Sequence, residues 1–222
     1  SAYNVKKCEN AKELVKNCKY VFLAVKPQMI EEVLNEISSA VSEDTVMVSI
    51  AAGITGEYIQ SKTIPTAKVI LVMPNTPLLL GEGASALSKL DTVKDDEFKL
   101  VCDVFSSCGE IAVIGKDKMK EIIAINGSSP AFIYLFAKGF IDYAESEGID
   151  TDTAKKLFCK TLVGSAKMIT DSGYSIDELI KMVSSPGGTT LKGLDELYAG
   201  NLVEVVKMAC KSCTQRAYEL SK

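Results

Sequence analysis

The sequence predicts an α/β domain over residues 1–115 followed by an all-helical domain over residues 116–222. Three observations support this division. Short, continuously apolar runs alternate with helix-like patterns in the first part, strand-like patterns are absent from Met119 onward, and a Pro-Gly-Gly-Thr-Thr stretch separates two helical patterns near the C-terminus. A chain of 222 residues is long enough for two modest domains, each with its own core.

Apolar runs predict three strands that are buried on both faces, as in a parallel sheet. These strands are expected over residues 20–25, 45–50 and 68–73. Apolar residues at helical spacing lie between them, which predicts helices over residues 29–40 and 55–61. The resulting strand–helix–strand–helix–strand order is typical of a doubly wound sheet.

The loops that follow these strands are candidate ligand-binding segments. They comprise residues 24–27, 50–53 and 74–77. Because the carboxyl ends of parallel strands meet at one edge of a sheet, we expect the three loops to share that edge, where ligands bind. Each loop could also serve only to end its strand, since Pro, Gly and Asn are common turn residues. The rest of the domain is expected to add an edge strand over residues 80–88, a helix over 95–107 and a strand over 110–114.

From Met119 onward the pattern is helical throughout. Helices are expected over residues 119–125, 129–147, 151–172, 176–182, 191–198 and 202–220. The segment 132–136 is apolar on every face, which predicts a helix that is buried all round. Faces this apolar favour a dimer interface, although a self-contained bundle core would also account for them.

Composition argues against several classes of function. The net charge of −4 makes nucleic acid and anionic membranes poor partners, and no apolar run approaches the roughly 20 residues of a membrane span. Because histidine is absent, His-based acid–base catalysis and most catalytic zinc sites are ruled out, and no metal is expected. Seven scattered cysteines are typical of reduced thiols in a cytoplasmic protein, and Cys210 and Cys213 are expected on a buried helix face.

The stretch from Ser184 to Thr190 predicts a ligand site in the helical domain. A helix start leaves N–H groups unpaired and carries a partial positive charge. Gly187 and Gly188 let the backbone approach a ligand closely, and Thr189 or Thr190 can cap the helix with a hydroxyl that points outward. The stretch therefore predicts a cradle for a small carboxylate, although an ordinary helix-capping turn has the same composition.

A dinucleotide site normally opens with the pattern strand–GxGxxG–helix, in which the glycines let the pyrophosphate sit on a helix start. The sequence contains no such pattern. The chain begins where the first strand–helix–strand unit should already have ended. Two interpretations stay open: the site does not bind a dinucleotide, or the first unit is absent from this chain.

Five motifs follow one another along the chain, and their ordered occurrence is far more specific than any one of them. They are Ala24-Val25-Lys26-Pro27, Ser49-Ile50-Ala51-Ala52-Gly53, Met73-Pro74-Asn75-Thr76-Pro77, Asn126-Gly127-Ser128-Ser129-Pro130-Ala131-Phe132 and Ser185-Pro186-Gly187-Gly188-Thr189-Thr190. With these motifs the sequence resembles the pyrroline-5-carboxylate reductase family over its full length. The resemblance implies a Rossmann-type nucleotide domain, a helical dimerisation domain that forms a homodimer, and reduction of 1-pyrroline-5-carboxylate to proline by NADPH or NADH.

The resemblance also implies roles for individual residues. Thr190 would be catalytic by hydrogen-bonding the imine nitrogen, and the backbone N–H groups of Gly188, Thr189 and Thr190 would hold the substrate carboxylate. The remaining substrate-binding residues would be Val183, Ser185 and Gly187. The residues lining the cofactor would be Ala24, Val25, Lys26, Pro27, Ile50, Ala51, Ala52, Ser129 and Ala131.

The chain departs from the family pattern at two points. The first strand, glycine-rich turn and first helix of the family have no counterpart, and these carry the residues that choose between NADH and NADPH. Val72 stands where many members carry a basic residue. Two alternatives to the reductase stay open: a reductase-like structural or regulatory dimer without catalysis, and a dehydrogenase of the same architecture that acts on hydroxy acids or sugar acids. The second alternative normally relies on a Lys-plus-Asn or His constellation, whereas this chain offers Gly-Gly-Thr-Thr.

Overall fold

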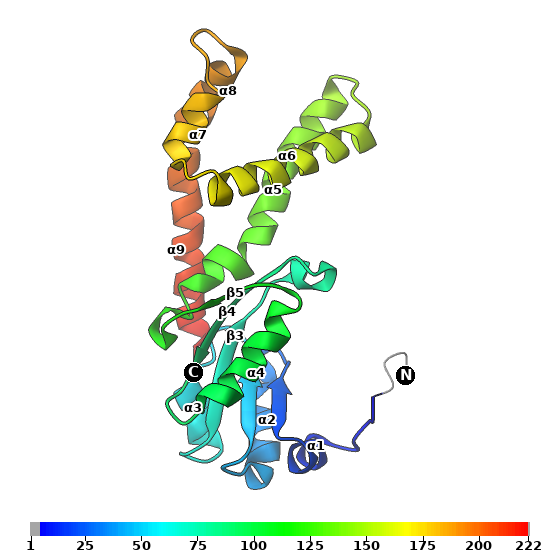
Figure 1. The fold of residues 1–222 in the computed structure, drawn as a ribbon, viewed down its shortest axis with the longest axis vertical. Helices are drawn as coiled ribbons and strands as arrows, with labels where there is room; N and C mark the ends of the chain where they lie inside the picture. Colours follow the sequence, from blue (N-terminus) through cyan, green and yellow to red (C-terminus); the bar gives the residue numbers. More distant parts are fainter. Residues whose placement is uncertain (1–4, 222) are drawn as a thin grey trace. The chain divides into compact units, whose positions relative to one another are not determined.

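The computed structural model describes residues 5–221, which Figure 1 traces in chain order. Contacts divide the chain into two compact units. The first, here called the sheet unit, holds the residues up to Pro130 together with those from Cys210 onward. The second, the helical unit, holds residues Ala131 to Ala209. The C-terminal helix therefore contributes residues to both units.

A five-stranded mixed sheet forms the centre of the sheet unit. Its strands are β1 (Tyr20–Leu23), β2 (Val46–Ser49), β3 (Lys68–Met73), β4 (Gly83–Lys89) and β5 (Gly109–Val113), paired in chain order. β1, β2 and β3 are parallel, β4 runs antiparallel to β3, and β5 is parallel to β4. The expected edge strand over residues 80–88 therefore lies inside the sheet, because β5 pairs with its far side.

Helices cover both faces of this sheet (Figure 1). The helices α1 (Ala11–Asn17), α2 (Ile30–Ile37) and α3 (Gly56–Lys62) lie on one face, and α4 (Asp95–Ser106) lies on the other. Successive residues of a strand point to opposite faces, so Met47 joins the core under α2 and α3 while Val46 and Val48 join the core under α4. Short 3₁₀ turns occupy residues 27–29, 38–40, 76–80 and 116–118. Two of them flank α2, so the helix expected over residues 29–40 is α-helical only in its middle.

The segment that follows β5 closes against the sheet. Instead of the helix expected over residues 119–125, it forms a turn and then a π-helix, η5 (Ile123–Gly127), in which Ser128 N–H donates to the Ile123 carbonyl at 2.8 Å. η5 packs on β3 and β4. Near the C-terminus, the Tyr218 hydroxyl donates to Glu121 Oε1 at 2.7 Å. This hydrogen bond ties the last turn of the C-terminal helix to the sheet unit.

The helical unit is built from five helices, of which the first and last also reach the sheet unit. They are α5 (Ser129–Ser146), α6 (Thr151–Asp171), α7 (Ile176–Met182), α8 (Thr189–Ala199) and α9 (Leu202–Leu220). Phe140 of α5 stacks on Phe158 of α6, with ring centroids 4.3 Å apart. The prediction that residues 132–136 are buried all round is wrong for the single chain, since Tyr134 and Leu135 are 61% and 71% exposed. No helix within residues 5–221 has the length and apolarity that a membrane crossing requires.

Candidate active site

The carboxyl ends of β1, β2 and β3 form one edge of the sheet. In the parallel register Leu23 lies opposite Ser49, and Val48 lies opposite Ile70. The three candidate loops therefore begin at the same edge, as the strand order predicts. The antiparallel β4 adds its first residues to this edge, because Met73 at the end of β3 pairs with Ala86.

The loop after β1 exposes its backbone and one cationic side chain. Ala24 and Lys26 are exposed, whereas Val25 and Pro27 are half-buried. The Lys26 carbonyl accepts the N–H of Met29 at 2.9 Å, which closes the 3₁₀ turn that Pro27 begins. The proline ring fixes the backbone φ at the first position of this turn.

The loop after β2 is made of small residues and is held in place by nearby backbone. Ala51 N–H donates to Ser49 Oγ at 3.4 Å, and Ile54 N–H donates to the Ala51 carbonyl at 3.4 Å. Gly53 has a φ of +79°, and a Cβ at this position would lie 3.1 Å from the Ala217 carbonyl oxygen of α9. The sharp turn therefore requires glycine, and Ala51 and Ala52 extend no large side chain from the edge.

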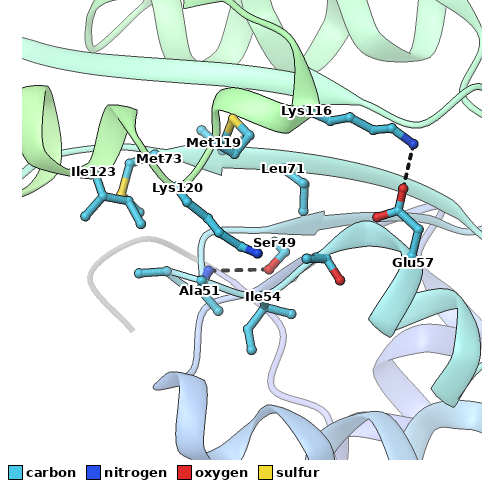
Figure 2. Close-up of a pocket in the computed structure, with 14 residues that line it drawn as sticks. Ser49, Ala51, Ile54, Glu57, Leu71, Met73, Lys116, Met119, Lys120 and Ile123 are labelled. Carbon is cyan, nitrogen blue, oxygen red and sulfur yellow. Dashed lines mark hydrogen bonds and ion pairs between the residues drawn. The ribbon is translucent and has the colours of Figure 1, made fainter. Parts of the chain in front are cut away.

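A cavity of about 50 Å³ lies beside this loop (Figure 2). The end of β3 lines it together with Lys116, Met119, Lys120 and Ile123. Two of its lining residues form an ion pair, with Lys116 Nζ 2.5 Å from Glu57 Oε1. This hydrogen bond lowers the pKa of the Glu57 carboxyl and raises the pKa of the Lys116 ammonium. The cavity has room for water and is far smaller than a nucleotide site.

Ser129 and Ala131 open the first helix of the helical unit. The Ser129 hydroxyl donates to the Ile125 carbonyl at 2.5 Å, so its oxygen can still accept a hydrogen bond. Ser129 is half-buried and belongs to the sheet unit, whereas Ala131 is exposed and is the first residue of the helical unit.

The stretch before α8 forms a tight turn. Gly188 N–H donates to the Ser185 carbonyl at 2.9 Å, and Gly187 has a φ of +73°. Proline at the second position and a left-handed glycine at the third are typical of a type II turn. The Gly188 N–H is therefore engaged within the turn, and its expected contact with a substrate carboxylate stays a prediction.

The turn delivers two open N–H groups at the start of α8, which begins at Thr189 and not at Leu191. Thr189 and Thr190 occupy the first two helical positions, where N–H groups have no acceptor inside the helix. No side chain of the described chain caps this helix, and both threonines are exposed. Val183 and Ser185 are also exposed on the approach to the turn. The arrangement can bind a small anion through two N–H groups and a neighbouring hydroxyl.

Sequence reasoning did not assign two asparagines that hold the sheet edge together. Asn75 Oδ1 accepts the N–H of Ala84 at 2.9 Å, and the Asn126 amide donates to the Met73 carbonyl at 2.7 Å. The sequence signal for both was their place within two of the five ordered motifs.

Open α/β sheets bind ligands beyond the carboxyl ends of their parallel strands, and many nicotinamide-dependent oxidoreductases use such an edge for the nucleotide. The edge shared by β1, β2 and β3 has the strand arrangement of that class. Two family models match it: one described as pyrroline-5-carboxylate reductase dimerisation over residues 116–220, and one described as NADP oxidoreductase, coenzyme F420-dependent, over residues 1–53.

Individual relatives agree with the first of these models. The pyrroline-5-carboxylate reductase of Escherichia coli (strain K12) is 32% identical over 220 residues, which span 99% of this chain and 82% of the relative. The Corynebacterium melassecola enzyme is 35% identical and spans 91% of this chain and 76% of its own length. The crystal structure of Plasmodium falciparum pyrroline carboxylate reductase with NADP bound matches with a TM-score of 0.93 at 30% identity, covering 99% of this chain and 86% of that one.

The chain belongs to the pyrroline-5-carboxylate reductase family, and its reaction is the reductase reaction of that family in proline biosynthesis, EC 1.5.1.2. The family is one of NADP-binding oxidoreductases. Val72, where many members carry a basic residue, is 2% exposed and lies in the core under α4. The side chain at this position therefore faces the core.

Proposed function

We propose that this protein reduces 1-pyrroline-5-carboxylate with Thr190 at the imine nitrogen, and that NADPH is its nucleotide. The observation that carries the proposal is the turn before α8, which leaves the N–H groups of Thr189 and Thr190 unused beside an exposed hydroxyl. A cyclic imino acid carries one carboxylate and one nitrogen, and these are the groups that such a helix start can hold.

The residues of the sheet edge fit a nicotinamide nucleotide. In the loop Ala24–Pro27, Ala24 and Lys26 are exposed. In the loop after β2, Ile50 is followed by Ala51 and Ala52, whose small side chains leave the strand ends open. Ser129 keeps a lone pair for a carboxamide N–H. When bound, the nucleotide supplies the hydride. The relative solved with NADP bound supports NADPH for this chain.

The substrate needs little beyond orientation. A cyclic imine is already electrophilic, so hydride addition requires positioning and one proton at nitrogen, not a strong base. The N–H groups of Thr189 and Thr190, at the positive end of α8, bind the carboxylate. The Thr190 hydroxyl then hydrogen-bonds the imine nitrogen and fixes which face of the ring is presented. A chain without histidine can perform this chemistry.

The helical unit forms a homodimer through its exposed apolar faces. Leu135, Leu157 and Val206 are each at least 47% exposed in the single chain, and the matching dimerisation model covers the helices that carry them. Large apolar side chains gathered on several helices are typical of a surface that another subunit covers.

The proposal is tested with the full protein by following NADPH oxidation with and without 1-pyrroline-5-carboxylate. Replacing Thr190→Ala should lower kcat about tenfold or more, because a hydrogen bond at the reacting centre contributes about 1–2 kcal/mol. Thr190→Ser keeps the hydroxyl and should recover most of the turnover. Thr66→Ala, at an exposed position before β3 and outside both candidate sites, is the matched control.

Two outcomes count against the proposal separately. Unchanged turnover in Thr190→Ala would remove Thr190 from its role while leaving the reaction in place. Nucleotide oxidation that does not depend on 1-pyrroline-5-carboxylate would remove the substrate assignment itself.

A further inference from the structure

A buried amide connects three segments at the candidate nucleotide edge. Asn126 lies in the π-helix η5 and is 9% exposed. Its Nδ2 donates one hydrogen bond to the Met73 carbonyl at 2.7 Å and a second to the Ala84 carbonyl at 2.9 Å. Met73 ends β3 and Ala84 lies near the start of β4, so one side chain bridges the strand that enters the loop and the strand that leaves it.

The same loop is held from its own side by a second asparagine. Asn75 Oδ1 accepts the Ala84 N–H at 2.9 Å. Ala84 therefore has its N–H bound by the loop and its carbonyl bound by η5. Gly127, next to Asn126, lies so close to β3 that a Cβ there would be 2.9 Å from the Met73 sulfur. η5 therefore lies in direct contact with the sheet edge, through the Asn126 hydrogen bonds and the close approach of Gly127 to Met73.

Stability alone does not account for the choice of asparagine. Asn126 Oδ1 is buried and has no hydrogen-bond partner among the described residues. A flip of the Asn126 side-chain amide would not supply a partner for Oδ1. It would place this oxygen against the Met73 and Ala84 carbonyl oxygens, which are acceptors themselves. A buried acceptor without a partner costs folding free energy, and such groups in native proteins call for an explanation. π-helical turns such as η5 are also frequent at functional sites.

We propose that Asn126 is a positioning residue of the reductase, which holds the strand-end loop 74–77 in register with the start of α5 so that both meet the nicotinamide end of the nucleotide. The inference rests on the proposed nucleotide site at this edge. Ser129 follows Asn126 by three residues, and its hydroxyl donates to the carbonyl of Ile125, the residue before Asn126, at 2.5 Å. A shift of η5 against β3 would move Ser129 and the loop relative to each other.

Replacing Asn126→Asp in the full protein replaces two N–H donors by at most one O–H donor and turns an oxygen toward a carbonyl, with almost no change of shape. We expect the KM for NADPH to rise about tenfold, the equivalent of about one hydrogen bond. We also expect the increase in melting temperature on adding NADPH to shrink, since the nucleotide then has to order the loop. Asn126→Ser keeps one donor and should give intermediate values. Asn35→Asp, the same change at an exposed site on α2, should leave both quantities at wild-type values.

A purely structural role predicts a different result. It would lower the melting temperature without nucleotide while leaving the KM and the NADPH-induced increase unchanged, and that result overturns the inference. If Asn126→Asp does not fold, the same two measurements on Asn126→Ser decide. A wild-type protein that does not reduce 1-pyrroline-5-carboxylate overturns the proposed function and this inference together, whereas an active wild type with unaffected variants overturns this inference alone.

Discussion

The buried carboxylate of Glu97 makes part of the stability of the sheet unit sensitive to acid. Glu97 lies on α4 and is 1% exposed. It accepts hydrogen bonds from Lys68 Nζ at 2.9 Å and from Lys94 N–H at 3.2 Å, and Lys19 Nζ lies 3.0 Å away. Burial by itself raises the pKa of Glu97, but these donors outweigh burial and lower the pKa from 4.5 to about 2.

The sign and size of the effect follow from this pKa. A folded-state pKa below the unfolded value means that folding favours the charged carboxylate. The stabilisation is therefore fully present above about pH 5 and is lost as the pH falls toward 2. The difference between 4.5 and about 2 corresponds to about 3 kcal/mol, at about 1.4 kcal/mol per pKa unit.

Urea unfolding of the wild type and of Glu97→Gln, at about pH 7 and about pH 3, measures this contribution. At neutral pH the variant should be about 3–5 kcal/mol less stable, because the buried Lys68 ammonium loses its carboxylate partner. On acidification the wild type should lose more free energy than the variant. Glu110→Gln, at an exposed glutamate of β5, should behave as the wild type. Equal losses on acidification in the wild type and in Glu97→Gln would refute the reasoning.

Three further substitutions test the turn before α8, the loop after β2 and the hydrogen bond at the end of α9. Gly188→Ala would place a Cβ 3.0 Å from the Ser185 carbonyl oxygen and 2.6 Å from Ser185 Oγ. We therefore expect weaker protection by proline in a thermal melt, and unchanged protection would contradict the close turn. Gly53→Ala combines a φ of +79° with a contact of 3.1 Å to the Ala217 carbonyl and should cost about 1–3 kcal/mol in urea unfolding; a neutral result would show that the loop can move. Tyr218→Phe removes a hydrogen bond of 2.7 Å to a carboxylate and should cost about 1 kcal/mol in the same assay. An equal loss in Tyr174→Phe, an exposed control, would assign that cost to something other than this hydrogen bond.

The sequence by itself determined the elements whose environment is uniform along the chain. Residues 68–73 are apolar throughout, and β3 has these bounds because both of its faces are covered. The helices at 176–182 and 202–220 were also predicted to the residue, since caps and apolar spacing are local signals. The sharing of one edge by three loops followed from parallel strand order alone. The family followed from five motifs that retain their order.

Only the tertiary structure decided what depends on partners distant in sequence. β4 pairs antiparallel with β3 on one side and parallel with β5 on the other. No local sequence pattern encodes the direction of a strand relative to its neighbours. The π-helical turn that places Asn126 between Met73 and Ala84 depends on two carbonyls more than forty residues away. The engagement of the Gly188 N–H by Ser185 depends on the dihedral angles of the turn, and composition does not set these. Periodicity reports how buried a residue is, whereas hydrogen bonding between segments is settled only when the chain has folded.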